Sequence, residues 1–281
     1  VLAQFGLQVL RKSRRPGLQQ LLKKAKANQT TLTEEDIGFA IGPRVNAASR
    51  MDTPEDAFLL LTASTLKEAD ERVAHLEELN QSRKTAVGQM TKELHKKMQL
   101  LDEVPAVIVM GDPTWRPSLV GLAANKLAEE YGRPAFIWGK DGNDVYKGSA
   151  RSGGATSVVT LMHAAAGAFK EYGGHHVAGG FAVTDDGIHT FGELLNQAHA
   201  ELGEEAFIKA EVIVDAVIRL EDVNQLLIND LKVLAPFGAG NRKPLFAFKN
   251  VAPIEVEQFG KTKEHLKLIF GTESGRSEAI A

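Results

Sequence analysis

The sequence predicts an α/β protein in which a long connecting helix leads into an α/β domain, with a small β-barrel after it. Three observations carry this prediction. Apolar residues recur at steps of three and four between Pro54 and about Leu101, which indicates a helix. Residues 105–139 read as strand, loop, helix and strand. After about residue 206, short apolar runs alternate with Gly, Pro and Asn, which is typical of small barrels.

Length and composition place the chain among globular proteins. Its 281 residues are 43% hydrophobic and 25% charged, enough for two cores. It contains no cysteine, which excludes disulfides and thiolate metal sites and fits a reducing cytoplasm. Apolar runs such as residues 105–110 are too short to span a bilayer, and no signal peptide is visible. We therefore expect a cytoplasmic protein that does not bind membranes.

The first 53 residues predict helices joined by polar segments. Residues 1–11 have an amphipathic helical pattern without a preceding cap, and the last residues stop within an expected strand, so we expect the chain to belong to a longer protein. Residues 11–30 hold seven Lys or Arg and no acid, which fits either a polyanion-binding surface or a solvated helical face. Thr33 predicts the cap of a short helix, and residues 42–57 predict an irregular connection.

The connecting helix, assigned to residues 54–102, has one irregularity. Asn80 and Arg83 occupy positions where its stripe should be apolar. Buried polar groups need partners. Two interpretations stay open: the helix end leaves its core there, or the helix turns these groups towards another domain.

The α/β domain is assigned to residues 103–205. Gly132 predicts the end of its first helix, and the strand–helix–strand order predicts a parallel strand pair. The expected elements that follow are a hairpin over 140–151, a helix over about 156–171, a glycine-rich loop, a strand at 181–184 and a helix at about 190–203. Residues 206–281 then predict a helix at about 221–234 and a barrel resembling an OB-fold, a fold suited to oligonucleotides.

Three segments have the composition of a phosphate pocket, namely residues 42–50, 147–152 and 173–180. Glycines let backbone N–H groups approach an anion, and arginine presents a planar fork that matches two phosphate oxygens. Each segment alone also fits a structural role, as a turn or a site of tight packing.

Other chemistries find less support. His175 and His176 are adjacent and would point to opposite sides of an extended segment, so we expect no complete metal site in this chain. The sequence also has no cysteine nucleophile, no G-x-S-x-G elbow and no Walker A loop.

Taken in order, the three segments resemble the RecJ family of the DHH phosphoesterase superfamily. Residues 1–53 resemble the end of the DHH domain and the linker after it, and 103–205 resembles the DHH-associated domain (DHHA1 type). The string LAPFGAGNRKPLF resembles the start of the family's OB-fold. The resemblance implies a single-stranded-DNA-specific 5′–3′ exonuclease of repair and recombination. It also implies two Mn²⁺ or Mg²⁺ ions, held by a DHH domain whose metal-binding motifs do not occur in this sequence.

The resemblance also assigns residues. It implies that Arg44, Ser149 and Arg151 hold the 5′-terminal phosphate and that His175, within its glycine loop, faces the scissile phosphate. Further substrate-binding candidates are Gly173, Gly174, Asn46 and Arg50. We expect these groups to converge on one nucleotide-sized anion site. Arg116 and Ser118 depart from the family, which more often has His and Gly there, and Ser49 replaces a frequent Gly.

Basic residues of the barrel are expected to track the DNA backbone. They are Arg242, Lys243, Lys249, Lys261, Lys263 and Lys267. Candidate base-stacking rings are Phe237, Phe246, Phe248 and Phe259, of which at most two should be exposed.

Two other functions stay open. The chain could belong to a DHH phosphoesterase acting on oligoribonucleotides or cyclic dinucleotides, although the barrel argues against that, or it could be a non-catalytic module that binds single-stranded nucleic acid. For the exonuclease, expected partners are single-stranded DNA and the DHH domain, candidate partners are a single-stranded-DNA-binding protein or a helicase, and the expected state is a monomer.

Overall fold

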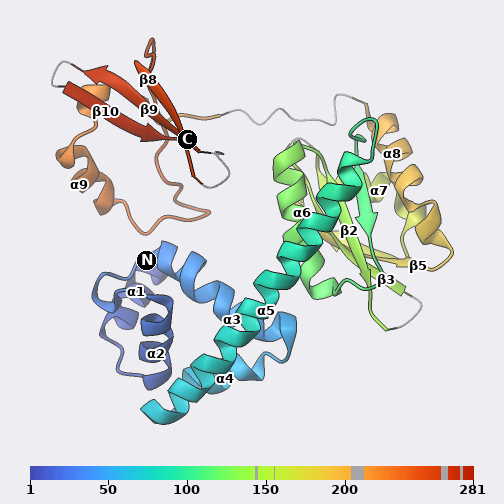
Figure 1. Ribbon diagram of the computed structural model, residues 1–281, viewed down its shortest axis with the longest axis horizontal. Helices are drawn as coiled ribbons and strands as arrows, with labels where there is room; N and C mark the ends of the chain where they lie inside the picture. The colour runs from blue at the N-terminus through green and yellow to red at the C-terminus, as the bar shows by residue number, and fades with distance from the viewer. Residues whose placement is uncertain (143–144, 155, 204–211, 261–264, 273–274) are drawn as a thin grey trace. The chain divides into compact units, whose positions relative to one another are not determined.

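The computed structural model describes residues 1–142, 145–154, 156–203, 212–260, 265–272 and 275–281. The chain divides into two compact units. Unit 1 combines Val1–Lys12, Thr31–Glu34 and Glu211–Ala281, and unit 2 combines Ser13–Thr30 and Glu35–Ala210. Figure 1 shows the helices and sheets of both units. The predicted α/β class, with a long helix and a β-rich C-terminal part, is confirmed.

The helical half of unit 2 packs around one long helix, α5 (Leu66–Gln99). Its other members are α2 (Pro16–Ala25), a π-helix (Asp36–Ile41), α3 (Gly42–Met51) and α4 (Glu55–Thr62). The predicted apolar stripe of α5 is buried at Val73, Leu76, Met90 and Leu94. Helix α5 leads from these helices to the sheet (Figure 1).

Two predictions for this half are wrong. Residues 42–57 are not an irregular connection, because α3 and α4 cover most of them. Pro43 lies in the first turn of α3, where a missing N–H costs no hydrogen bond, and Ala47 and Ala48 are fully buried. Residues 54–102 are also two helices, since α5 begins anew at Thr65, whose hydroxyl accepts a bond from the Glu68 N–H.

The second half of unit 2 is a five-stranded sheet of order β1-β2-β3-β5-β4. The strands are β1 (Ile108–Gly111), β2 (Ala135–Lys140), β3 (Val145–Arg151), β4 (Glu171–Gly174) and β5 (Ala178–Thr184). The predicted parallel pair, β1 with β2, is confirmed. The hairpin predicted over 140–151 begins earlier than predicted, because its first strand is β2, which pairs with β3. Helix α6 (Pro117–Tyr131) connects β1 to β2 and packs on one face with α5. Helices α7 (Val158–Ala164) and α8 (Phe191–Leu202) pack on the other face.

The glycine-rich segment is part of this sheet and not a loop. Gly173 and Gly174 end β4, Gly179 and Gly180 follow the first residue of β5, and the two strands pair as a hairpin. The helix expected over 156–171 is correspondingly shorter. The chain becomes extended at Phe169 because its ring packs in the core with Phe136, Phe181 and Phe191.

Unit 1 contains two small sheets and two helices within its described residues. The helices are α1 (Leu2–Lys12) and α9 (Gln225–Val233). One sheet is antiparallel, with β8 (Glu255–Phe259), β9 (His265–Thr272) and β10 (Gly275–Ile280), and the other pairs β6 (Ala216–Val217) with β7 (Phe246–Ala247). Short 3₁₀ turns of the described chain lie at Gln29–Thr31, Ala166–Ala168, Gly187–His189 and Leu220–Asp222. Across the described residues, no helix combines the length and apolar character needed to cross a bilayer.

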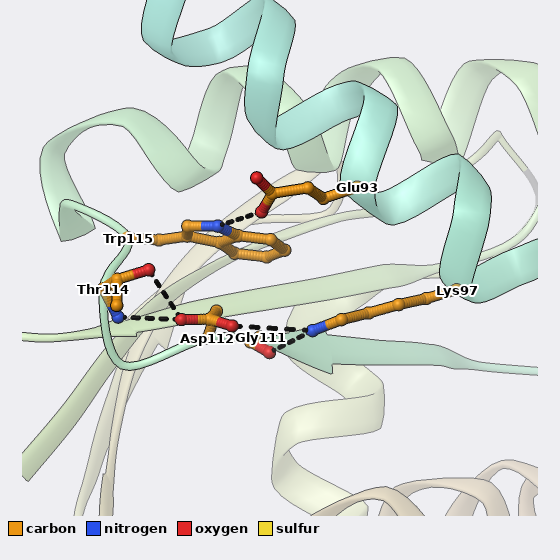
Figure 2. A network of polar contacts seen from close by, with 6 residues as sticks. All are labelled: Glu93, Lys97, Gly111, Asp112, Thr114 and Trp115. Atoms are coloured by element: carbon orange, nitrogen blue, oxygen red, sulfur yellow. Dashed lines mark hydrogen bonds and ion pairs between the residues drawn. The ribbon is translucent and has the colours of Figure 1, made fainter.

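A polar network fastens α5 to the loop between β1 and α6 (Figure 2). The indole N–H of buried Trp115 donates to Glu93 Oε2 at 3.0 Å, and Lys97 Nζ donates to the Gly111 carbonyl at 2.9 Å. The Lys97 ammonium also lies 5.0 Å from the centre of the indole ring. Asp112 accepts from the hydroxyl and N–H of Thr114, and these bonds, with the charge of Lys97, lower the pKa of its carboxyl.

We predict that Trp115→Ala lowers the free energy of unfolding of unit 2 by about 3–5 kcal/mol, because it removes a buried aromatic side chain. Trp115→Phe should cost about 0.5–1.5 kcal/mol for the lost N–H bond. Urea titration followed by the fluorescence of Trp138, the second of the two tryptophans, would measure both effects. Equal stability of Trp115→Ala and the parent protein would contradict the role of the network.

Candidate anion-binding site

Strand β3 directs Ser149 and Arg151 to the face of the sheet that carries α6. The residue between them, Ala150, is buried in the core of the opposite face. A Cβ atom built on Gly121 of α6 would lie 3.1 Å from both Arg151 Nη2 and Ser149 Oγ. The missing side chain at this one position therefore lets the guanidinium and the hydroxyl lie directly against the helix.

Arg151 shares its surroundings with two other arginines of unit 2. The charge of Arg50, on α3, acts on both Arg151 and Arg83. Burial first, and then this charge, lower the pKa of each of these two side chains. Arg50 Nη1 donates to the Ser118 carbonyl at 2.7 Å, and Arg151 Nη1 donates to the Ala150 carbonyl at 2.8 Å. Within the part of the chain that the structure describes, no carboxylate forms an ion pair with any of the three.

Helix α5 contributes two buried donors. Asn80 is 1% exposed, and its Oδ1 accepts a bond of 3.0 Å from Arg83 Nη2. Asn80 Nδ2 and Arg83 Nε are also buried, yet neither has a partner among the described residues. Of the two interpretations of this interruption, the structure supports the second, because Asn80 is inside the protein and Arg83 faces groups of other elements. The broken apolar stripe was the sequence signal for it.

A cavity of about 840 Å³ joins these elements. Arg83 and Lys84 line it from α5, Gly121 and Lys126 from α6, and Arg151 from β3. One acid, Glu129, also lines it and accepts a bond from Asn125. The excess of cations indicates an anionic ligand for this cavity.

The substrate-binding residues predicted within the segment 42–50 have different neighbours in the structure. Arg44 forms an ion pair of 2.7 Å with Glu77 and also donates to the Ala40 carbonyl. Asn46 is exposed, and its carbonyl accepts a bond from the Ser49 hydroxyl. The arginine of α3 that acts on Arg151 is therefore Arg50, whereas the Arg44 guanidinium is already neutralised. The substrate roles of Arg44 and Asn46 stay predictions.

His175 lies in the tight turn between β4 and β5. Its N–H donates to the Ala178 carbonyl at 2.9 Å, and the residue is exposed. Gly174 is required by packing, since a Cβ there would lie 2.4 Å from that same carbonyl, whereas a Cβ on Gly173 would have no atom within 4 Å. The backbone at Gly173 therefore borders open space, so a ligand could approach it closely. The role of His175 stays a prediction.

The basic residues of unit 1 support the predicted contact with the DNA backbone less strongly than the arginines of unit 2 support an anion site. Arg242 and Lys249 are exposed, and Lys243 is exposed with a partner of its own. Lys267 pairs with Glu278 at 3.0 Å, and this carboxylate, followed by Glu257 and Glu255, raises the pKa of its ammonium. Lys261 and Lys263 lie outside the described residues. The acids around Lys267 reduce its attraction for a polyanion.

The expected stacking rings of unit 1 divide by exposure. Phe248 and Phe259 are about one-third exposed, at 36% and 37%, and the Phe259 ring lies 5.5 Å from the ring of His265. Phe237 and Phe246 are half-buried. Two phenylalanines thus present part of a ring at the surface.

One trio could hold a cation. Asp52, Asp56 and His75 bring ligand atoms within 4.8 Å of one another, and His75 Nε2 lies 3.3 Å from Asp56 Oδ2. Three ligand atoms suit one ion and do not fit a two-ion centre. No sequence pattern indicated this trio, because its residues lie on separate elements.

Two domain families match the chain. The DHHA1 domain family matches residues 103–204, and the RecJ OB domain family matches residues 214–281. The single-stranded-DNA-specific exonuclease RecJ of Bacillus subtilis is 31% identical over 100% of this chain, which covers 36% of that protein. The protein of the same name from Haemophilus influenzae is 29% identical over 98% of this chain, which covers 49% of it. The chain thus spans between about a third and a half of these relatives.

A solved structure has the same fold. The crystal structure of RecJ in complex with Mn²⁺ from Thermus thermophilus superposes with a TM-score of 0.82 at 29% identity. The match covers 99% of this chain and 40% of that chain. A second structure of that protein contains Mg²⁺ and gives a TM-score of 0.80.

We predict that Gly121→Ala weakens anion binding without weakening the fold. Alanine favours a helix over glycine by up to about 1 kcal/mol, but its Cβ would displace Arg151 and Ser149. Melting temperatures measured with and without inorganic phosphate should show a smaller phosphate-induced rise in this variant. The control is Gly88→Ala in α5, where a Cβ would meet no atom within 4 Å. An unchanged phosphate response of Gly121→Ala would place the anion elsewhere.

Proposed function

The chain belongs to the RecJ family, and from that membership we propose that it forms the DNA-binding part of a metal-dependent exonuclease that degrades single-stranded DNA from the 5′ end. The observation that carries this proposal is the cluster of Arg50, Arg83 and Arg151 beside Ser149, with no neutralising carboxylate among the described residues. Such a cluster favours a multiply charged anion. A 5′-terminal phosphate is the dianion that a strand end offers.

In this proposal the residues of unit 2 bind and orient the strand end. The Arg151 guanidinium forms charge-assisted hydrogen bonds with the terminal phosphate, and the Ser149 hydroxyl donates to another of its oxygens. Fixing the terminal phosphate sets which phosphodiester bond is presented for hydrolysis and gives the 5′–3′ direction. His175 donates to the next phosphate of the strand from its exposed turn.

Divalent metal ions, as in the Mn²⁺ and Mg²⁺ complexes of the Thermus protein, would activate the attacking water. The trio of Asp52, Asp56 and His75 does not fit a two-ion centre, so we assign that chemistry to the DHH domain of the family. A single-stranded-DNA-binding protein or helicase as partner, a monomeric state and a cytoplasmic location stay predictions.

The two other functions are less well supported. A phosphoesterase for small substrates has no use for the part that matches the RecJ OB domain family, over residues 214–281. A purely binding module is physically possible for this chain taken alone, and hydrolysis is the property that separates it from the exonuclease.

We predict that the chain alone binds single-stranded DNA in the presence of Mn²⁺ but does not hydrolyse it. Fusing it behind a DHH domain of the RecJ family, with its D-x-D and D-H-H motifs, should yield release of mononucleotides from the 5′ end. The assay follows a 3′-labelled oligonucleotide on a denaturing gel. Products that shorten from the 3′ end, or a fusion that binds but never cleaves, would overturn the proposed function.

We predict that Arg151→Ala weakens binding of a 5′-phosphorylated oligonucleotide by roughly 10- to 100-fold, the equivalent of one charged hydrogen-bonded pair. Binding of the same oligonucleotide with a 5′-hydroxyl should change little. Fluorescence anisotropy at constant salt would give both dissociation constants. Arg133→Ala, which removes an exposed arginine of the same domain, is the matched control. Equal losses on the two oligonucleotides would argue against a terminal-phosphate pocket.

A further inference from the structure

The strongest unexplained feature of unit 2 is a pair of buried donors without acceptors on helix α5. Asn80 Nδ2 and Arg83 Nε are buried and unpartnered among the described residues, although the two side chains bond to each other through Arg83 Nη2 and Asn80 Oδ1. A buried donor without an acceptor costs free energy, and such groups are rare in folded proteins. Of the two residues, Arg83 also lines the cavity of about 840 Å³, so its guanidinium is the group that a ligand with acceptor oxygens could reach.

The electrostatics of the same place determine the charge of that ligand. Arg83 and Arg151 each lie within the field of Arg50, and Arg83 and Arg151 line one cavity. Both side chains are partly desolvated, which makes the repulsion that each feels from Arg50 stronger than it would be in water. A neutral ligand would satisfy the donors but leave this repulsion, whereas an anion with several oxygens satisfies both.

We propose that Arg83, oriented by Asn80, is a third cationic arm of the phosphate site, so that the connecting helix itself binds the strand's terminal phosphate together with Ser149 and Arg151. This inference rests on the proposed function. Arg83 is a binding residue in it, and Asn80 is a positioning residue that holds the guanidinium through its Oδ1.

A third cation also makes the site selective. A terminal phosphate carries close to two negative charges near neutral pH, whereas an internal phosphodiester carries one. Each additional guanidinium near the ligand increases the preference for the dianion. Arg83 should therefore contribute more to discrimination between strand ends and strand interiors than to general affinity for DNA.

The test compares Arg83→Gln with Lys92→Gln. Both variants remove one positive charge from α5, but Lys92 is exposed and lies nine residues away, about two and a half turns, on the opposite side of the helix. Binding is measured with one oligo-dT carrying either a 5′-phosphate or a 5′-hydroxyl. Arg83→Gln should reduce the preference for the phosphorylated strand by roughly tenfold, while Lys92→Gln leaves it unchanged.

A second readout separates ligand binding from a structural role. Inorganic phosphate should raise the melting temperature of Arg83→Gln less than it raises that of the parent protein, because the variant lacks one cation of the site. Arg83→Lys keeps the charge without the planar fork and should lose only part of the preference. A structural role alone would lower the melting temperature and leave the strand-end preference intact.

The outcomes distinguish this inference from the proposed function. If Arg151→Ala loses the preference for the phosphorylated strand and both Arg83 variants keep it, helix α5 is not part of the site and the proposed function stands. If neither Arg151→Ala nor Arg83→Gln changes the preference, the phosphate pocket itself is refuted. If Arg83→Gln loses it and Arg83→Lys keeps part of it, the third arm is established.

Discussion

Unit 2 must hold three guanidinium groups, those of Arg50, Arg83 and Arg151, near one another. Among the described residues no carboxylate neutralises them, so Arg50 repels the other two. Other contacts must hold their elements in place. At the junction of α3 and α6, Arg50 Nη1 donates to the Ser118 carbonyl and the Ser118 hydroxyl donates back to the Arg50 carbonyl, both at 2.7 Å. Arg116 Nη1 adds a bond of 3.0 Å to the Met51 carbonyl. Ser118 thus holds Arg50 in its place, and Arg116 holds the neighbouring Met51 at the end of α3.

Helix α5 contacts other elements of unit 2 along its length and so fixes where Arg83 lies. Its first half carries Glu77, which neutralises Arg44, its middle carries Asn80 and Arg83, and its second half carries Glu93 and Lys97, which bind the β1–α6 loop (Figure 2). Because contacts before and after Arg83 hold the helix, the position of Arg83 relative to β3 is fixed as well. The energy lost to repulsion among the arginines is offset by contacts located elsewhere, as is common for binding sites.

The sequence predicted the regular elements because their apolar spacing is regular. The stripe of α5 and the strand–helix–strand unit of β1, α6 and β2 follow directly from periodicity. Helix α3 was missed because its sequence is polar and begins with Gly-Pro, and its burial comes from small alanines. Missing this helix also affected the prediction of the phosphate-binding residues. Arg44 and Arg50 are six residues apart, which places them on different sides of a helix. Had the helix been predicted, the two arginines would not both have been assigned to one site. Arg83 was visible as a break in a pattern, but the other cations of its surroundings, Arg50 and Arg151, come from α3 and β3, which no local pattern connects.

The glycine segment shows why residue type alone could not assign function. Gly173, Gly180 and Ser149 are paired across β4, β5 and β3, so they form one row on the face that carries α6. Gly173 borders open space and Gly180 has a single atom 4.0 Å from a built Cβ, whereas Gly174 and Gly179 are packed too tightly for a side chain. Half of these four glycines therefore serve the fold and half leave the sheet bare. The bare row extends about 10 Å from Ser149, two strand spacings across the sheet. Under the proposed function, a DNA strand whose 5′ end is held at Ser149 would meet uncovered backbone along this row. This explains why the β4–β5 hairpin, whose turn contains His175, has glycine in both of its β-strands.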